Sequence, residues 1–179
     1  MLSTDRLILR PWRTADLPVL ASMFGDAHVM RFFDRPRSEA EAATWMQRTQ
    51  AHIDRHGFGI WAVELRAGGA LIGFVGLSHV PPTMPPAPGV EVVWTLAEAY
   101  WRQGYATEAA RCAMQDGFDR IGLHEIVAFT AAVNLPSQLL MRTLGMRAEP
   151  SRDFNHPRIP PENRLCRHVF YRRAHPGRS

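Results

Sequence analysis

A glycine-containing loop that runs into a helix at residues 100–110 has the composition of a phosphate-binding site. Gly104 gives this loop free backbone dihedrals, and Thr107 stands as a cap before a run of strong helix formers. A loop that enters a helix in this way leaves backbone N–H groups pointing outward, with the positive end of the helix dipole behind them. The sequence therefore predicts that a phosphate group binds at residues 100–110.

Positive charge in this chain is carried by arginine alone, because the sequence contains no lysine. The net charge is +4, and nine arginines fall within residues 142–178. A guanidinium group stays protonated at any accessible pH, so these charges are permanent. The arginines are dispersed among proline, asparagine and histidine instead of lining one helix, which favours an anionic ligand such as a nucleotide phosphate over a nucleic acid.

The hydrophobic content of 46% over 179 residues is typical of one folded domain, whose core would bury roughly two-thirds of the surface of the unfolded chain. No apolar run approaches the ~20 residues that cross a bilayer, and the first residues lack the regions of a signal peptide. We therefore expect a cytoplasmic protein without a membrane partner. Its single domain is expected to cover residues 1–173, followed by a disordered tail at residues 174–179.

Strands and helices alternate along the chain in an order that places the loop at residues 100–110 against a sheet. The expected strands are residues 6–10, 59–65, 70–78, 90–95, 125–130 and 166–172, and the expected helices are residues 14–24, 29–33, 38–55, 107–120 and 134–145. Ser38 and Glu41 form a capping box, and five prolines make residues 80–89 a loop. This order predicts a mixed α/β sheet with helices on both faces.

Three segments follow one another in a fixed order: residues 4–11, residues 91–110, and residues 129–146 with Asn134, Ser137 and a Leu-Gly-Met triplet. Together they resemble the GNAT superfamily of acyl-CoA-dependent N-acetyltransferases, and within it the RimJ/RimL-like group. The resemblance covers nearly the whole chain. It implies an α/β (α+β) fold with a mixed, mostly antiparallel sheet of about six to seven strands and a splayed central strand pair.

The same resemblance implies that acetyl-CoA is the co-substrate and that no metal takes part. Backbone amides of the loop would hold the pyrophosphate, and the preceding strand would bind the pantetheine arm and polarise the thioester carbonyl. Trp101 replaces the polar residue with which the family's loop usually begins. The implied cofactor-binding residues are Val92, Val93, Trp94, Thr95, Arg102, Gln103, Gly104, Tyr105, Ala106, Thr107, Asn134 and Ser137.

Two residues are implied to be catalytic. Glu91 lies on the strand that would flank the acetyl group, where its carboxylate would remove a proton from the amine through water. The alternative is a solvated carboxylate or a salt-bridge partner. Ser137 matches the residue that reaches the CoA sulfur in the RimJ/RimL-like group, and the alternative is an ordinary first-turn serine. Many relatives carry a tyrosine where this chain has Met141, which cannot donate a proton.

One further pair of side chains has a spacing that metal sites use. His52 and His56 stand four residues apart on an expected helix, so their rings lie on one face. No third ligand is evident in the sequence. We interpret the pair as part of an exposed helix face and expect no metal there.

These observations predict an N-acetyltransferase that moves the acetyl group of acetyl-CoA directly to a primary amine, either a protein N-terminus or a small-molecule amine. Neither Cys112 nor Cys166 lies where an acyl-enzyme would form. The alternative is a non-catalytic CoA-binding or regulatory module of the same fold, which Met141 favours and Glu91 and Ser137 oppose. The sequence argues against nucleic acid as a partner and leaves a homodimer open.

Overall fold

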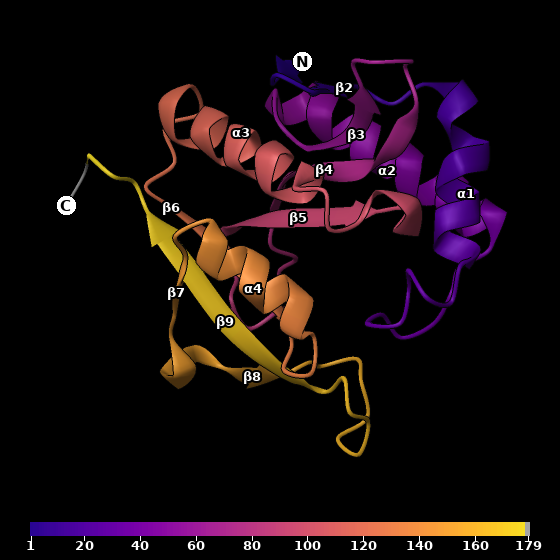
Figure 1. Ribbon diagram of the computed structural model, residues 1–179. Coiled ribbons are helices and arrows are strands. Elements are labelled where there is room, and N and C mark those ends of the chain that lie inside the picture. Colours follow the sequence, from indigo (N-terminus) through magenta and orange to yellow (C-terminus); the bar gives the residue numbers. More distant parts are fainter. Residues whose placement is uncertain (178–179) are drawn as a thin grey trace.

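A computed structural model describes residues 1–177, which form a nine-stranded sheet with the path β1-β2-β3-β4-β5-β6-β9-β7 and with β8 beside β9. Neighbouring strands are antiparallel except for the parallel pair β5 and β6 (Figure 1). The strands are β1 (Leu2–Ser3), β2 (Leu7–Arg10), β3 (Ile60–Leu65), β4 (Leu71–His79), β5 (Val90–Leu96), β6 (Glu125–Ala131), β7 (Arg147–Ala148), β8 (Phe154–Asn155) and β9 (Arg167–Ala174). The predicted mixed, mostly antiparallel sheet is confirmed. Six to seven strands were too few, because two-residue strands such as β1 leave no periodic pattern in a sequence.

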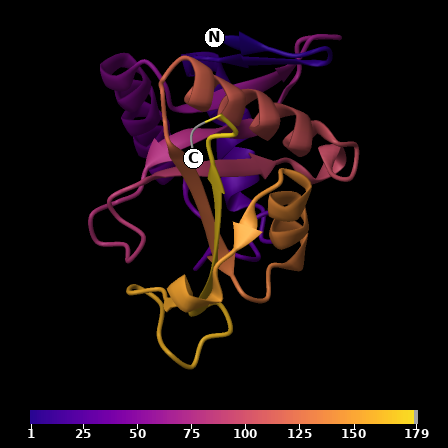
Figure 2. The same cartoon turned by 90° about the vertical axis from the view of Figure 1, so that its left-hand side faces the viewer.

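Helices cover both faces of the sheet, as predicted. They are α1 (Leu17–Gly25), α2 (Glu39–His56), α3 (Tyr105–Asp119) and α4 (Leu135–Thr143), with short 3-10 turns η1 (Thr14–Asp16), η2 (Glu98–Tyr100) and η3 (Pro150–Arg152). Phe74 of β4 meets the ring of Phe24 on α1 at 5.9 Å and that of Trp45 on α2 at 4.6 Å. Three residues further along β4, Leu77 packs against Gly117 of α3 on the opposite face. Figures 1 and 2 show α3 lying across the strands there.

Local capping chemistry fixes the start of α2. The Ser38 hydroxyl accepts a hydrogen bond from the Glu41 backbone N–H at 3.3 Å, and the Glu41 carboxylate accepts one from the Ser38 N–H at 2.9 Å. The predicted capping box is therefore confirmed. The helix expected at residues 29–33 is wrong. The Asp26 side chain accepts hydrogen bonds from the N–H groups of His28 and Val29, which holds this segment in turns.

The end of the chain is more ordered than expected. Strand β9 continues to Ala174, and the backbone N–H of His175 donates to the carbonyl of His124 at 2.8 Å. The disordered tail predicted from residue 174 therefore starts too early, because the backbone groups of residues 174 and 175 pair with other segments of the same chain. Residues 178–179 of that tail lie outside the described residues. Within residues 1–177, no helix combines the length and apolarity needed to cross a membrane.

Several arginines of the C-terminal region are neutralised by neighbouring carboxylates. Arg172 pairs with Glu125 at 2.9 Å and also with Glu149, and Arg152 lies 3.6 Å from Glu149. Arg167 lies 3.6 Å from Asp153. These pairs tie β9 to the segments on either side of it, so part of the basic excess counted in the sequence belongs to intramolecular ion pairs.

Candidate active site

Strands β5 and β6 diverge at the centre of the sheet. Each is seven residues long, yet they are paired at one position only, where Glu91 lies opposite Val127. Beyond that position β5 stays paired with β4, whereas β6 pairs with β9 (Figure 1). The edge of β5 that faces β6 therefore has backbone groups without a strand partner after Glu91. The splayed central pair expected from the resemblance is present.

Residues of β5 alternate between the two sides of the sheet. Glu91 lies opposite Ser78 and Thr95 opposite Phe74, so both share the face on which α1 and α2 pack. Val93 lies on the same face, opposite Gly76, whereas Val92 and Trp94 lie on the face covered by α3. Val92 and Thr95 are buried, and Val93 and Trp94 are half-buried. The splay thus has Glu91 on one side of the sheet and Trp94 on the other.

Glu91 has the protonation properties of a general base that works near neutral pH. Burial raises the pKa of its carboxyl to about 7 from the ordinary value of 4.5. Part of the residue stays accessible. Within residues 1–177 no hydrogen bond or ion pair engages its carboxylate, so the salt-bridge alternative does not hold there. A base with a pKa close to the working pH combines adequate ionisation with adequate basicity.

A hydrogen-bonded cluster joins β5 to the start of α4 across the splay. The Trp94 indole N–H donates to the Ser137 hydroxyl oxygen at 3.3 Å. The Asn134 side-chain amide donates to the same oxygen at 3.0 Å and to the Thr130 hydroxyl at 2.8 Å. Asn134 also caps α4, because its carbonyl oxygen accepts from the Ser137 backbone N–H at 3.3 Å. The predicted residues Trp94, Asn134 and Ser137 are therefore brought together.

The arrangement around Ser137 leaves its own proton free. Its oxygen accepts two hydrogen bonds, from Trp94 and Asn134, and a hydroxyl group also has one O–H to donate. Two donors directed at the oxygen polarise that O–H, which then suits an anionic acceptor. Met141 is only 1% exposed and belongs to the core. Thr130 lies in the segment at residues 129–146 but was not among the predicted site residues, although its hydroxyl accepts from Asn134 and so fixes the orientation of that side chain.

The loop before α3 is shaped by two residues in the left-handed region. Arg102 has φ of 60° and Gly104 has φ of 83°. Gly104 is the N-cap of α3 and offers no capping side chain, so the first N–H groups of the helix have no side-chain acceptor from it. The cap predicted at Thr107 is wrong. The left-handed turn at Gly104 starts the helix three residues earlier and places Thr107 in its first turn, with Tyr105 and Ala106 before it.

Contacts around this loop distinguish side chains that have intramolecular partners from one that is exposed. Glu108, the acidic residue of the first turn, is neutralised by Arg6 at 2.6 Å and accepts a hydrogen bond from Thr4 at 2.5 Å. The Arg6 guanidinium also stacks on the Tyr105 ring at 4.5 Å. Gln103 donates to the Ala99 carbonyl at 2.9 Å. The side chains of Gln103 and Tyr105 thus have intramolecular partners, whereas Arg102 is exposed.

An open hollow of about 730 Å³ lies beside the first three turns of α3, toward β1 and β2. Its lining includes Gly104, Thr107, Arg111 and Cys112 but neither Glu91 nor Ser137. The hollow therefore adjoins the loop before α3 and does not include the splay between β5 and β6. Arg111 donates to the Thr143 carbonyl at 3.4 Å, which holds a positive charge beside the hollow.

Comparison with known proteins gives consistent results. Residues 6–147 match the family model described as an acetyltransferase (GNAT) domain. The chain is 30% identical to the uncharacterised N-acetyltransferase YoaA of Bacillus subtilis, over 83% of this chain and 84% of YoaA. It superposes on the spermidine N-acetyltransferase of Vibrio cholerae, solved with CoA and spermine, with a TM-score of 0.76, 20% identity and coverage of 96% and 97%. It also superposes on the ribosomal-protein-S5-alanine acetyltransferase of Vibrio fischeri with a TM-score of 0.76 and 19% identity, over 98% of this chain and 96% of that one.

Proposed function

Because this chain belongs to the GNAT family of acetyltransferases, we propose that it transfers the acetyl group of acetyl-CoA directly to a primary amine, with Glu91 as general base and Ser137 as proton donor. The observation that carries the assignment is the position of these two groups at one splay. Glu91, with a pKa of about 7, faces the α1 and α2 side, and the Ser137 hydroxyl lies on the α3 and α4 side. A base and a proton donor on opposite sides suit a reaction that joins two substrates through the gap.

The donor is proposed to bind along β5 and the loop before α3. Uncapped N–H groups at the start of α3, together with the helix dipole and the exposed Arg102, favour a pyrophosphate there. The unpaired edge of β5 beyond Glu91 offers N–H and C=O groups to the amides of pantetheine. Val92 and Thr95 are buried, so they support this edge through their backbone and not through their side chains.

The proposed reaction then follows from the positions of the two groups. The Glu91 carboxylate accepts a proton from the amine through a water molecule, and the amine nitrogen attacks the thioester carbonyl carbon. An unpaired N–H of β5 near Val93 stabilises the oxyanion of the tetrahedral intermediate. The C–S bond breaks as the intermediate collapses, and the departing sulfur takes the Ser137 hydroxyl proton. Solvent water then returns a proton to Ser137, and Glu91 releases to solvent the proton that it took from the amine. The products are an N-acetyl amine and free CoA.

The acceptor is proposed to be either a protein N-terminal amine or a small primary amine. The two solved proteins named above have these two kinds of acceptor in their names, and at about 20% identity the likeness to them concerns the fold. A panel should contain polyamines, amino acids and peptides that begin with serine, alanine or methionine. Thiol release is measured with acetyl-CoA present, and product masses are recorded. We expect release above the hydrolytic background with at least one acceptor, together with an acetylated product.

A protein that binds acetyl-CoA but acetylates no member of the panel would overturn the catalytic proposal in favour of the non-catalytic module. Acetyl-CoA binding is therefore measured in the same preparation by calorimetry. In the proposed reaction Ser137 is the proton donor, so methionine at position 141 does not by itself favour that module.

Substitution of Ser137 by alanine is expected to lower kcat by roughly 100-fold, because the thiolate then departs without a proton from the protein. The affinity for acetyl-CoA should change much less, and Ser137→Thr, which keeps a hydroxyl, should recover part of the rate. Both variants are compared by steady-state kinetics and calorimetry with Ser22→Ala, an exposed serine on α1. A normal kcat in Ser137→Ala with a good acceptor would exclude the proton-donor role.

A further inference from the structure

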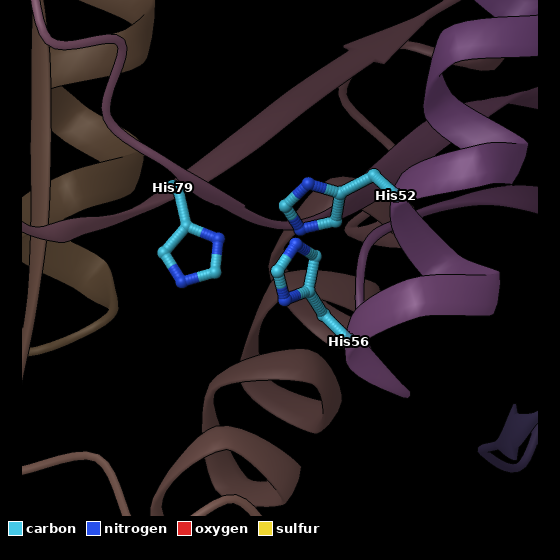
Figure 3. A group of neighbouring side chains, drawn as sticks. All are labelled: His52, His56 and His79. Carbon is cyan, nitrogen blue, oxygen red and sulfur yellow. The ribbon is translucent and has the colours of Figure 1, made fainter.

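Three histidines come together at the end of the sheet where β4 stops and β3 begins. His52 and His56 project from the last turns of α2 toward His79, the final residue of β4 (Figure 3). One ring nitrogen from each lies within 4.8 Å of those of the other two. The ring centroids are separated by 4.5 Å for His52 and His56, 4.7 Å for His56 and His79, and 5.2 Å for His52 and His79. The interpretation of His52 and His56 as an exposed helix face is therefore incomplete, because His79 is the missing third residue.

One atom of this cluster is unsatisfied. The Nε2 atom of His52 is buried without a hydrogen-bond partner, and it is the one side-chain nitrogen or oxygen of this kind among residues 1–177. Buried polar atoms are almost always paired, so an orphaned one points to a ligand that the bare chain does not include. The ring centroid of buried Phe58 lies 5.4 Å from that of His52 and 5.3 Å from that of His79, so an apolar ring packs against both imidazoles.

An arginine that reaches the end of α2 beside the cluster has intramolecular partners of its own. The nearby Arg120 bonds to the Gly57 carbonyl at 3.0 Å and is neutralised by Asp116 at 2.6 Å, so its charge opposes a cation only weakly.

We propose that His52, His56 and His79 bind one divalent transition-metal ion, with Zn²⁺ the best match, in a three-nitrogen site whose fourth position is open to water. Imidazole nitrogens are ligands of choice for zinc, and two histidines four apart on a helix with a third from another element make a recurrent donor set. Tetrahedral Zn–N bonds of about 2.0–2.1 Å place the nitrogens roughly 3.4 Å apart. The ring nitrogens now lie within 4.8 Å of one another. His56 and His79 are exposed, so their rings have room to move to the separation of roughly 3.4 Å that zinc requires.

The metal would connect the C-terminal end of α2 to the C-terminal end of β4. His56 lies in the last turn of α2, and His79 ends β4 immediately before the proline-rich loop at residues 80–89. Its neighbour Ser78 is the register partner of Glu91. Binding should therefore fix the end of α2 to the strand beside the general base, and it supplies no group to the acetyl transfer. The site stands independently of the proposed function.

The test uses full-length protein without a histidine tag, treated with a chelator and then titrated with Zn²⁺ against a chromophoric indicator. We expect one ion per chain with a dissociation constant at or below the micromolar range. His79→Ala and His56→Ala should each weaken binding at least tenfold to 100-fold, because even substitutions outside the ligand set commonly have effects of that size. The matched control His124→Ala, an exposed histidine outside the cluster, should bind like the parent.

Two further measurements make the outcome decisive. Co²⁺ in place of Zn²⁺ should give the visible absorption of a four-coordinate site in the parent and lose it in His79→Ala. Zn²⁺ should raise the Tm of the parent but not of His79→Ala, whose Tm without metal and circular dichroism report whether it is folded. Equal zinc affinity in the parent and in folded His79→Ala would overturn the proposal, as would a parent that binds no zinc at micromolar concentration.

Discussion

Glu91→Gln is expected to lower kcat by roughly 100-fold or more while acetyl-CoA still binds with near-parental affinity. Glutamine is similar in shape but accepts no proton at neutral pH, and general-base catalysis contributes typically 10²-fold to 10⁴-fold. Glu91 lies on the α1 and α2 side of the sheet, away from the loop where the pyrophosphate is proposed to bind. Steady-state kinetics with a saturating acceptor, together with calorimetry for acetyl-CoA, separates the two effects.

The pH dependence provides a sharper version of this test. Because burial raises the pKa of Glu91 to about 7, its base function should decline as the pH falls through 7. The amine titrates as well, so the informative quantity is the ratio of parental to variant kcat/KM, in which the acceptor's own titration cancels. This ratio should be largest above pH 7 and shrink below it. A constant ratio, or one no greater than that for the exposed control Glu162→Gln, would show that Glu91 is not the base.

The same substitution is expected to increase the free energy of unfolding above pH 7 by up to about 3 kcal/mol. This figure follows from the rise of the Glu91 pKa from 4.5 to about 7, because each pKa unit corresponds to about 1.36 kcal/mol. An ionised carboxylate without a partner is destabilising in this buried position, and the neutral amide removes that effect. Residual accessibility of Glu91 makes the figure an upper bound. Urea unfolding of the parent and of Glu91→Gln at pH 5 and pH 8 measures it.

The sign follows from proton binding in the folded and unfolded states. Between about pH 4.5 and pH 7 folded Glu91 retains a proton that the unfolded chain has released, so the parent loses stability as the pH rises through this window. Above pH 7 both states are ionised and the loss is complete. The stability difference between Glu91→Gln and the parent should therefore grow across the window and then level off. A difference that does not change with pH would mean that the carboxyl group titrates normally.

Features that depend on nearby residues were predictable from the sequence. Ser38 and Glu41 lie within one helical turn, and Asn134 caps the next turn of its own helix, so short-range chemistry determines both starts. The proline-rich loop at residues 80–89 follows from the missing N–H groups of proline. The glycine loop before α3 was located correctly, although its cap was assigned to the wrong residue.

Features that depend on residues far apart in the sequence were not predictable in the same way. The Trp94 and Ser137 side chains meet across 43 positions, and no pattern in either segment indicates the other. His79 belongs to a strand of mostly buried residues, and only the pairing of β4 with β3 and β5 brings it to the end of α2. The raised pKa of Glu91 arises from burial in the folded protein, which the residues beside it in the sequence do not indicate.

The absence of a capping side chain at Gly104 has a consequence for the stability of the donor-free protein. Serine, threonine, asparagine or aspartate at an N-cap contributes typically ~1 kcal/mol over alanine but only a few tenths of a kcal/mol over glycine, which provides none of the side-chain bonds. In the proposed binding mode the pyrophosphate oxygens accept the hydrogen bonds that such a side chain would accept. Acetyl-CoA would thus serve as the cap of α3, so that the first turn of this helix is completed by the substrate and loosens each time CoA leaves.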